Sequence, residues 1–158
     1  MDVISTESLS ELNKRYRTTA IIYFAQIWTA AALIAACWFF IKDAENPVDS
    51  DSLTPLWVAI IFIAVGAFVL RRVFLKWERL RDVKLLKGVS GLLGKLQTNS
   101  IILGSMAEII AVVGVVIALQ NGSKNDVLRA GLVSLIVFVI NFPRKSVWRK
   151  IVANLEKV

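Results

Sequence analysis

The sequence predicts an all-α integral membrane protein, a four-helix bundle that crosses a bilayer four times. Hydrophobic residues make up 56% of the 158-residue chain, above the roughly 45–50% of soluble domains. Four mostly apolar stretches are each long enough to cross a membrane as a helix. Lys and Arg gather on one side of these stretches. A chain of this length forms one domain, so we take residues 1–158 as a single transmembrane domain.

The first two predicted spans are residues 18–41 and 55–75. Residues 18–41 carry no charged side chain and would form a helix of about 36 Å at roughly 1.5 Å per residue, which is enough to cross a bilayer with some tilt. An acidic loop follows. Thr54 with Pro55 is typical of a helix start, because the hydroxyl caps the first turn and the missing proline N–H costs nothing there.

Residues 84–97 predict an amphipathic helix beside the membrane. Its apolar residues share one helical face, while lysines and glycines occupy the remainder. A basic amphipathic helix next to membrane spans lies most simply in the cytoplasmic interface, with its apolar face toward the lipid. The glycines weaken it as an isolated helix, so we expect it to depend on the membrane or on neighbouring helices. The apolar residues are Leu85, Leu86, Val89, Leu92, Leu93 and Leu96.

The third and fourth predicted spans are residues 101–119 and 126–142. Glu108 is the only charged residue in the third span, and Pro143 closes the fourth. A basic tail follows.

The distribution of charge predicts how the chain is oriented. Of the 19 Lys and Arg residues, 16 lie on the side of the two termini and three on the other side. By the positive-inside rule, both termini then lie in the cytoplasm. We expect the chain in the plasma (inner) membrane. Orientation and attraction to anionic lipid explain the net charge of +7, so nucleic acid is not expected as a partner. Candidates for binding lipid headgroups are Arg71, Arg72, Lys76, Arg144 and Lys145.

The composition argues against most catalytic and redox chemistry. The chain contains no histidine and a single cysteine, Cys37. It therefore lacks the commonest metal ligand and general base, and it cannot form an internal disulfide or a paired-cysteine metal site. No nucleophile–base set or phosphate-binding loop is visible. We expect no enzyme activity, no metal and no cofactor.

Glu108 is the candidate functional residue, for binding an ion or a proton. A carboxylate near the centre of a membrane span costs about 2.5–3.5 kcal/mol, so it usually faces other helices or water. Small residues lie on or beside its helical face and would let another helix approach closely. We therefore predict that Glu108 points at a helix. The small residues of this packing face are Gly104, Ala107, Ala111, Gly114 and Ala118.

Two resemblances accompany this pattern. Residues 104–119 resemble the carboxylate-bearing helix of the proteolipid (c-type) rotor subunits of vacuolar-type and F-type ATPases, which implies a proton- or sodium-carrying role for Glu108. That resemblance covers 16 residues, and residues 18–41 lack the glycines of the family's partner helix. The whole chain resembles small four-helix bacterial membrane proteins of unassigned function. These share an Ala-Glu third span, here Ala107–Glu108, and a Phe-Pro-Arg ending, here Phe142–Arg144.

Three functions stay open on the sequence. The leading one is a non-catalytic accessory or structural subunit of a larger membrane complex, for example a respiratory or photosynthetic one. It follows from the small size, the missing catalytic sets and the small-residue face. The second is proton or ion translocation through Glu108. The third is a self-contained bundle in which Glu108 is a structural, hydrogen-bonding residue.

Overall fold

A computed structural model describes residues 5–41 and 50–156 of the chain. Within these ranges the regular structure is entirely helical, and four helical stretches are long and apolar enough to cross a membrane. This confirms the all-α class and the four apolar helices expected of a multi-pass membrane protein. The helices are α1 (Thr6–Phe40), α2 (Ser50–Phe74), α3 (Trp77–Asn121), α4 (Lys124–Asn141) and α5 (Lys145–Glu156).

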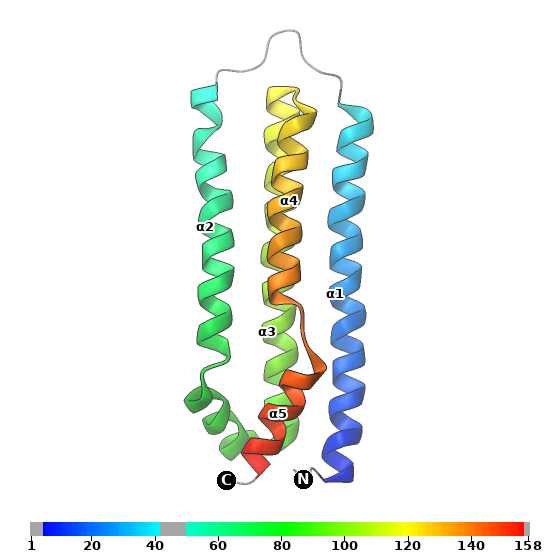
Figure 1. The fold of residues 1–158 in the computed structure, drawn as a ribbon, viewed down its shortest axis with the longest axis vertical. Coiled ribbons are helices and arrows are strands. Elements are labelled where there is room, and N and C mark those ends of the chain that lie inside the picture. The colour runs from blue at the N-terminus through cyan, green and yellow to red at the C-terminus, as the bar shows by residue number, and fades with distance from the viewer. Residues whose placement is uncertain (1–4, 42–49, 157–158) are drawn as a thin grey trace.

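The central pair of the bundle is α3 and α4, with α1 and α2 on opposite sides of it (Figure 1). Both central helices contact both flanking helices, whereas α1 and α2 do not contact each other over the described residues. The pair α3 and α4 therefore lies between α1 and α2. The short α5 lies beyond the end of α4, at the end of the bundle where α1 begins, and contacts α1 and α3.

Two helices begin earlier than the sequence pattern predicts. α1 starts at Thr6 and runs unbroken into the first predicted span; the Ser5 hydroxyl caps it by accepting a hydrogen bond from the Ser8 N–H at 3.2 Å. α2 starts at Ser50, so Pro55 lies in its second turn instead of at its start. Because a proline removes the bond to the residue four positions earlier, and only about one turn precedes it here, α2 tolerates it.

The predicted interfacial helix, residues 84–97, is not present as one element. Gly88 has φ 67° and ψ −171° and breaks α3 at this point, with a positive φ that glycine adopts readily. Leu86, before the break, is 82% exposed, whereas Leu92 and Leu93 after it are fully buried. The residues after Gly88 extend the third span and pack against protein. An apolar face has the same sequence pattern whether lipid or protein covers it.

The C-terminal basic tail of the sequence prediction forms α5 and closes one end of the bundle. Its apolar residues Trp148, Val152 and Leu155 lie in one buried cluster with Leu12 of α1 and with leucines of α3. Tyr16 of α1 meets the Trp148 ring edge-on, with ring centroids 5.7 Å apart. The spacing of these apolar residues, four and three apart, is helical and is the signal that would have predicted α5.

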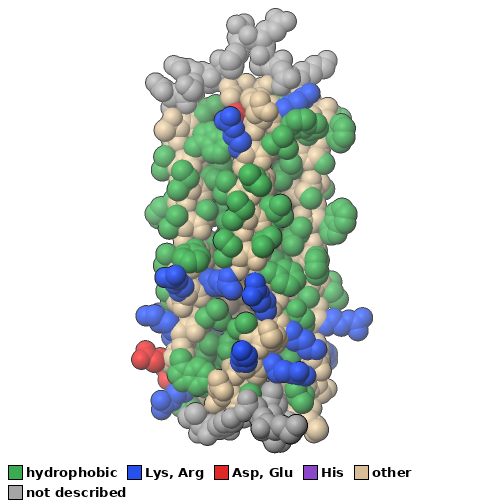
Figure 2. All heavy atoms as spheres, in the orientation of Figure 1, with side chains coloured by type: hydrophobic (Ala, Val, Ile, Leu, Met, Phe, Trp, Pro, Cys, Tyr) green, Lys and Arg blue, Asp and Glu red, His purple; other side chains and the backbone are tan. Residues whose placement is uncertain are grey.

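The surface has an apolar belt and one strongly basic end. Figure 2 shows hydrophobic side chains over the middle of the bundle and Lys and Arg gathered toward the end that carries α5. We call this the basic end. Large apolar side chains on the outer faces are widely exposed, including Trp28 (74%), Phe40 (86%) and Phe62 (78%). Such a surface suits contact with lipid tails.

Candidate functional site

The small-residue face predicted on α3 lies inside the bundle. A Cβ on Gly114 would overlap the Cβ of Ala130 on α4, so the two helices can approach closely at this point. The Ser134 hydroxyl of α4 donates to the Ala107 carbonyl at 2.7 Å. Helices of this chain therefore already occupy the face, and it offers no surface to a partner subunit. Its buried members are Gly104, Ala107, Ala111, Gly114 and Ala118.

Gln26 of α1 makes a polar contact with α3 in the same region. Its Nε2 donates to Ser105 Oγ at 2.9 Å and to the Ile101 carbonyl at 3.4 Å. Its Oε1 is buried and has no hydrogen-bond partner among the residues that the structure describes. A Cβ on Gly104 would overlap this oxygen, so the glycine makes room for the amide against the α3 backbone.

Glu108 lies one helical turn beyond Gly104 and is half-buried. Because residues four apart share one face of a helix, Glu108 lies on the same face of α3 as Gly104, the residue that Gln26 packs against. None of the hydrogen bonds or ion pairs among the described residues involves Glu108. No cluster of three or more His, Cys, Asp or Glu that would hold a metal occurs in the described part of the chain.

α1 carries a second small-residue face, which turns away from the bundle. Its members are spaced four, three and four residues apart, so they lie on one side of the helix. The buried residues of α1, such as Tyr23 and Ala30, lie on the opposite side. Sequence reasoning missed this face because only the fold shows which side of each helix is covered. The face, which we call the α1 outer stripe, consists of the exposed residues Ala25, Thr29, Ala32 and Ala36.

The C-terminal end of α4 is held by both flanking helices. The last carbonyls of a helix have no partner within it, and Pro143 prevents α4 from continuing. The Tyr23 hydroxyl of α1 donates to the Phe138 carbonyl at 2.9 Å. From the other side, the Arg71 guanidinium of α2 donates to the Ile140 carbonyl. Side chains thus replace the backbone donors that this end lacks.

A cavity of about 50 Å³ lies beside this end of α4, among α2, α3, α5 and the α4–α5 link. Asn99 and Asn141 line it and are only 4% and 5% exposed. Within residues 5–41 and 50–156, both amide atoms of Asn99 and the Oδ1 of Asn141 are buried without a hydrogen-bond partner, while Asn141 Nδ2 donates to the Val137 carbonyl at 2.9 Å. Arg71 and Arg144 also line the cavity. Sequence reasoning missed the two asparagines, which are ordinary residues at helix ends until the fold brings them together.

The five predicted headgroup-binding residues therefore divide into two groups. Arg71 and Arg144 border the cavity. Arg72 instead stacks on its own helix, with its guanidinium carbon 4.6 Å from the centroid of the Phe68 ring. Lys76 and Lys145 are exposed to solvent or lipid and do not line the cavity.

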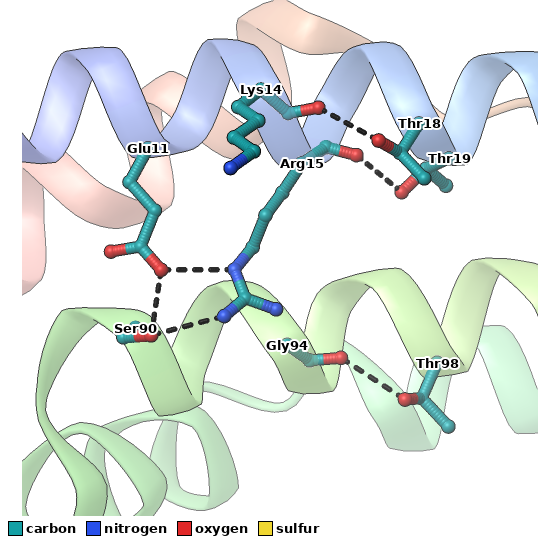
Figure 3. Close-up of polar contacts among 8 residues, drawn as sticks. All are labelled: Glu11, Lys14, Arg15, Thr18, Thr19, Ser90, Gly94 and Thr98. Atoms are coloured by element: carbon teal, nitrogen blue, oxygen red, sulfur yellow. Dashed lines mark hydrogen bonds and ion pairs between the residues drawn. The ribbon is translucent and has the colours of Figure 1, made fainter.

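A polar contact links α1 to α3 just beyond the Gly88 break (Figure 3). Ser90 Oγ donates to Glu11 Oε1 at 2.6 Å and accepts from Arg15 Nη2 at 3.0 Å. Arg15 Nε also donates to Glu11 Oε1 at 3.0 Å. The hydrogen bond from Ser90 lowers the pKa of the Glu11 carboxyl, and Arg15 lowers it further. This contact joins the first turn of α3 after the break to α1.

Comparisons with protein-family models, with curated proteins and with solved structures find no match for this chain. Its function is therefore inferred from its own surfaces and sites.

Proposed function

We propose that the chain is a non-catalytic accessory subunit of a larger membrane protein complex, which it joins through the α1 outer stripe. Apolar side chains gain little by leaving lipid for another apolar surface, so helix association in membranes depends on close packing. A stripe of small residues permits that packing. Trp28 and Phe39, which are 74% and 81% exposed, are eleven residues apart and therefore lie on the same side of the stripe, where they would pack along a docked helix. The exposure of this stripe is the observation that carries the proposal.

The test compares bulk added to α1 with bulk added to α2. Ala32→Ile and Ala36→Ile together would fill the stripe, whereas Val58→Ile and Val65→Ile add bulk to exposed positions of α2 (59% and 57%). Native purification in mild detergent, followed by identification of co-purifying chains, should show the same partner with the wild type and the α2 variant. The α1 variant should lose that partner while remaining folded. Retention of the partner by the α1 variant, or its absence from the wild type, contradicts the proposal.

We infer that both ends of the chain face the cytoplasm, in the plasma (inner) membrane. The 16 Lys and Arg residues on the side of the termini, against three on the other, support this orientation. In that placement, the segment before Gly88, with exposed Leu85 and Leu86, would lie in the interface. A membrane-impermeant thiol reagent applied outside the cell should label Asn125→Cys and not Ser146→Cys, both in a Cys37→Ser background. Labelling of Ser146→Cys and not of Asn125→Cys would show the opposite orientation.

A second function, proton translocation through Glu108, has one supporting observation. Glu108 is a half-buried carboxyl group in a membrane-spanning helix and has no hydrogen bond or ion pair among the described residues, so it is free to bind and release a proton. Glu108→Gln keeps the shape and the donor but cannot titrate, so it would abolish proton flux in proteoliposomes if Glu108 carries protons. We expect the structural outcome, in which Glu108→Gln is nearly silent and Glu108→Leu loosens the α1–α3 contact. Modification of Glu108 by dicyclohexylcarbodiimide that slows as pH rises would favour the translocating role.

A further inference from the structure

We propose that the cavity at the basic end binds the phosphate of an anionic membrane lipid whose headgroup carries hydroxyl groups. The walls of the cavity carry polar groups that lack partners. Asn99 and Asn141 present three buried amide atoms that have no hydrogen-bond partner among the described residues. At about 50 Å³ the cavity has room for about three or four water-sized groups. A few polar atoms of a headgroup would fit, and the rest of the lipid would lie outside in the bilayer.

The charge of the walls selects an anion. Arg71 and Arg144 line the cavity, and no Asp or Glu lines it in the described part of the chain. A guanidinium group matches the oxygens of a phosphate with two parallel hydrogen bonds. Arg71 is also anchored, because it donates to the Ile140 carbonyl at the end of α4. Its position toward a phosphate is therefore fixed before the ligand arrives.

The position in the fold selects a lipid. Arg71 lies in the last turn of α2, and Asn141 is the last residue of α4. The apolar belt gives way to the basic end at these helix ends (Figure 2), and lipid phosphates lie at this depth of a bilayer. Apolar walls from Phe74, Leu75 and Trp148 suit the carbon atoms next to the phosphate.

The unpaired amide atoms select the headgroup. Asn99 Nδ2 is a donor and suits a phosphate oxygen. The two Oδ1 atoms, of Asn99 and Asn141, are acceptors, and a lipid phosphodiester has no proton to offer them. The hydroxyls of a headgroup such as glycerol supply these donors. Phosphatidylglycerol meets both requirements, whereas phosphatidylcholine has no hydroxyl and no net charge.

The experiment measures lipid binding to the purified full-length chain by native mass spectrometry and by thermal unfolding in detergent. Phosphatidylglycerol should bind about tenfold more tightly than phosphatidylcholine and should raise the unfolding temperature. Arg71→Gln with Arg144→Gln should abolish this preference. The matched control, Arg72→Gln with Lys145→Gln, removes the same charge outside the cavity and should keep the preference.

Asn99→Leu separates binding from folding, because it leaves both arginines in place. It removes two unpaired buried polar atoms, so the lipid-free variant should unfold at a higher temperature than the wild type. The same variant should show a smaller increase on addition of phosphatidylglycerol. A merely structural asparagine would not give these two opposite changes.

Three outcomes would overturn the proposal. Equal loss of lipid preference in the cavity variant and its control would show diffuse attraction to the basic end. Stabilisation by inorganic phosphate as strong as that by phosphatidylglycerol would assign the cavity to a soluble anion. No response to either ligand in the wild type would leave the cavity to water alone.

Discussion

The two sides of α3 hold their neighbours in different ways. Toward α4 and α1, α3 presents glycine and alanine, and hydrogen bonds join it to Ser134 and Gln26. Toward α2, contact is made by larger apolar side chains, and Gly66 of α2 lies beside the flexible Met106 of α3. Residues 56–70 of α2 carry no polar group other than the Trp57 indole. The first kind of contact fixes distance and register, whereas the second mainly covers apolar area.

The largest expected effect comes from adding one methyl group at the α3–α4 contact, and the same change at the α2–α3 contact serves as the comparison. In Gly114→Ala the new Cβ would overlap Ala130 Cβ, and neither atom can rotate away, so α3 and α4 must separate. We expect a loss of about 1–3 kcal/mol in unfolding free energy. In Gly66→Ala the new Cβ would lie 3.6 Å from Met106 Cε, an ordinary contact, and a gain of up to about 1 kcal/mol is expected because alanine favours helix over glycine.

Unfolding of both glycine variants by titration with a denaturing detergent measures these changes. Equal destabilisation by the two substitutions would show that α2 is held as rigidly as α4. That result would remove the distinction between the two sides of α3.

A middle-sized effect is expected from Tyr23→Phe. The change removes the hydrogen bond to the Phe138 carbonyl and keeps the edge-on contact with the Phe138 ring, whose centroid is 5.6 Å away. Unfolding free energy should fall by about 0.5–1.5 kcal/mol. Tyr16→Phe is the matched control, since that hydroxyl donates to the Pro143 carbonyl at 3.1 Å in a partly exposed place. A larger loss from the control would mean that the end of α4 is not held mainly by Tyr23.

The smallest effect concerns pH and the Ser90 contact. The pKa of Glu11 is lowered from its ordinary value of 4.5, so its contribution to stability is present above pH 4.5 and is lost as pH falls through the lowered pKa. Ser90→Ala removes the main cause of this shift and should flatten the dependence of the unfolding temperature on pH below that value. Because the group is near water, we expect a change below about 1 kcal/mol. If the unfolding temperatures of the wild type and Ser90→Ala fall equally in acid, Ser90 is not the main cause of the lowered pKa of Glu11.

The sequence predicted the helices well and their environment poorly. Length and hydropathy decide whether a segment can cross a bilayer, so the four apolar helices were predictable. The small residues of α3 and the α1 outer stripe have similar spacings, yet one set is buried and the other exposed, and the difference arises only when helices pack. The leucines after Gly88 show the same limit, since their periodic face was assigned to lipid and is covered by α1 and α5.

Only some residues of the candidate cavity could be predicted from the sequence. Its arginines stand out at the ends of two spans, because basic residues gather there. Its asparagines do not, because Asn99 and Asn141 belong to different helices and line one cavity only after these helices pack together. Glu108 stood out by its charge, but the contact of Gln26 with the preceding turn of α3 depended on the register between α1 and α3.

The separation of α1 from α2 has a consequence for how the chain is made. Synthesis delivers the N-terminal helices first, and these two share no contact over the described residues. Each leaves the translocation machinery with its inward face still on lipid, and that face is covered only when the second hairpin enters between them. The chain can therefore be divided and expressed as two fragments, residues 1–76 and 77–158. The first fragment should be degraded when it is made alone. The two fragments should form a stable protein when they are made together.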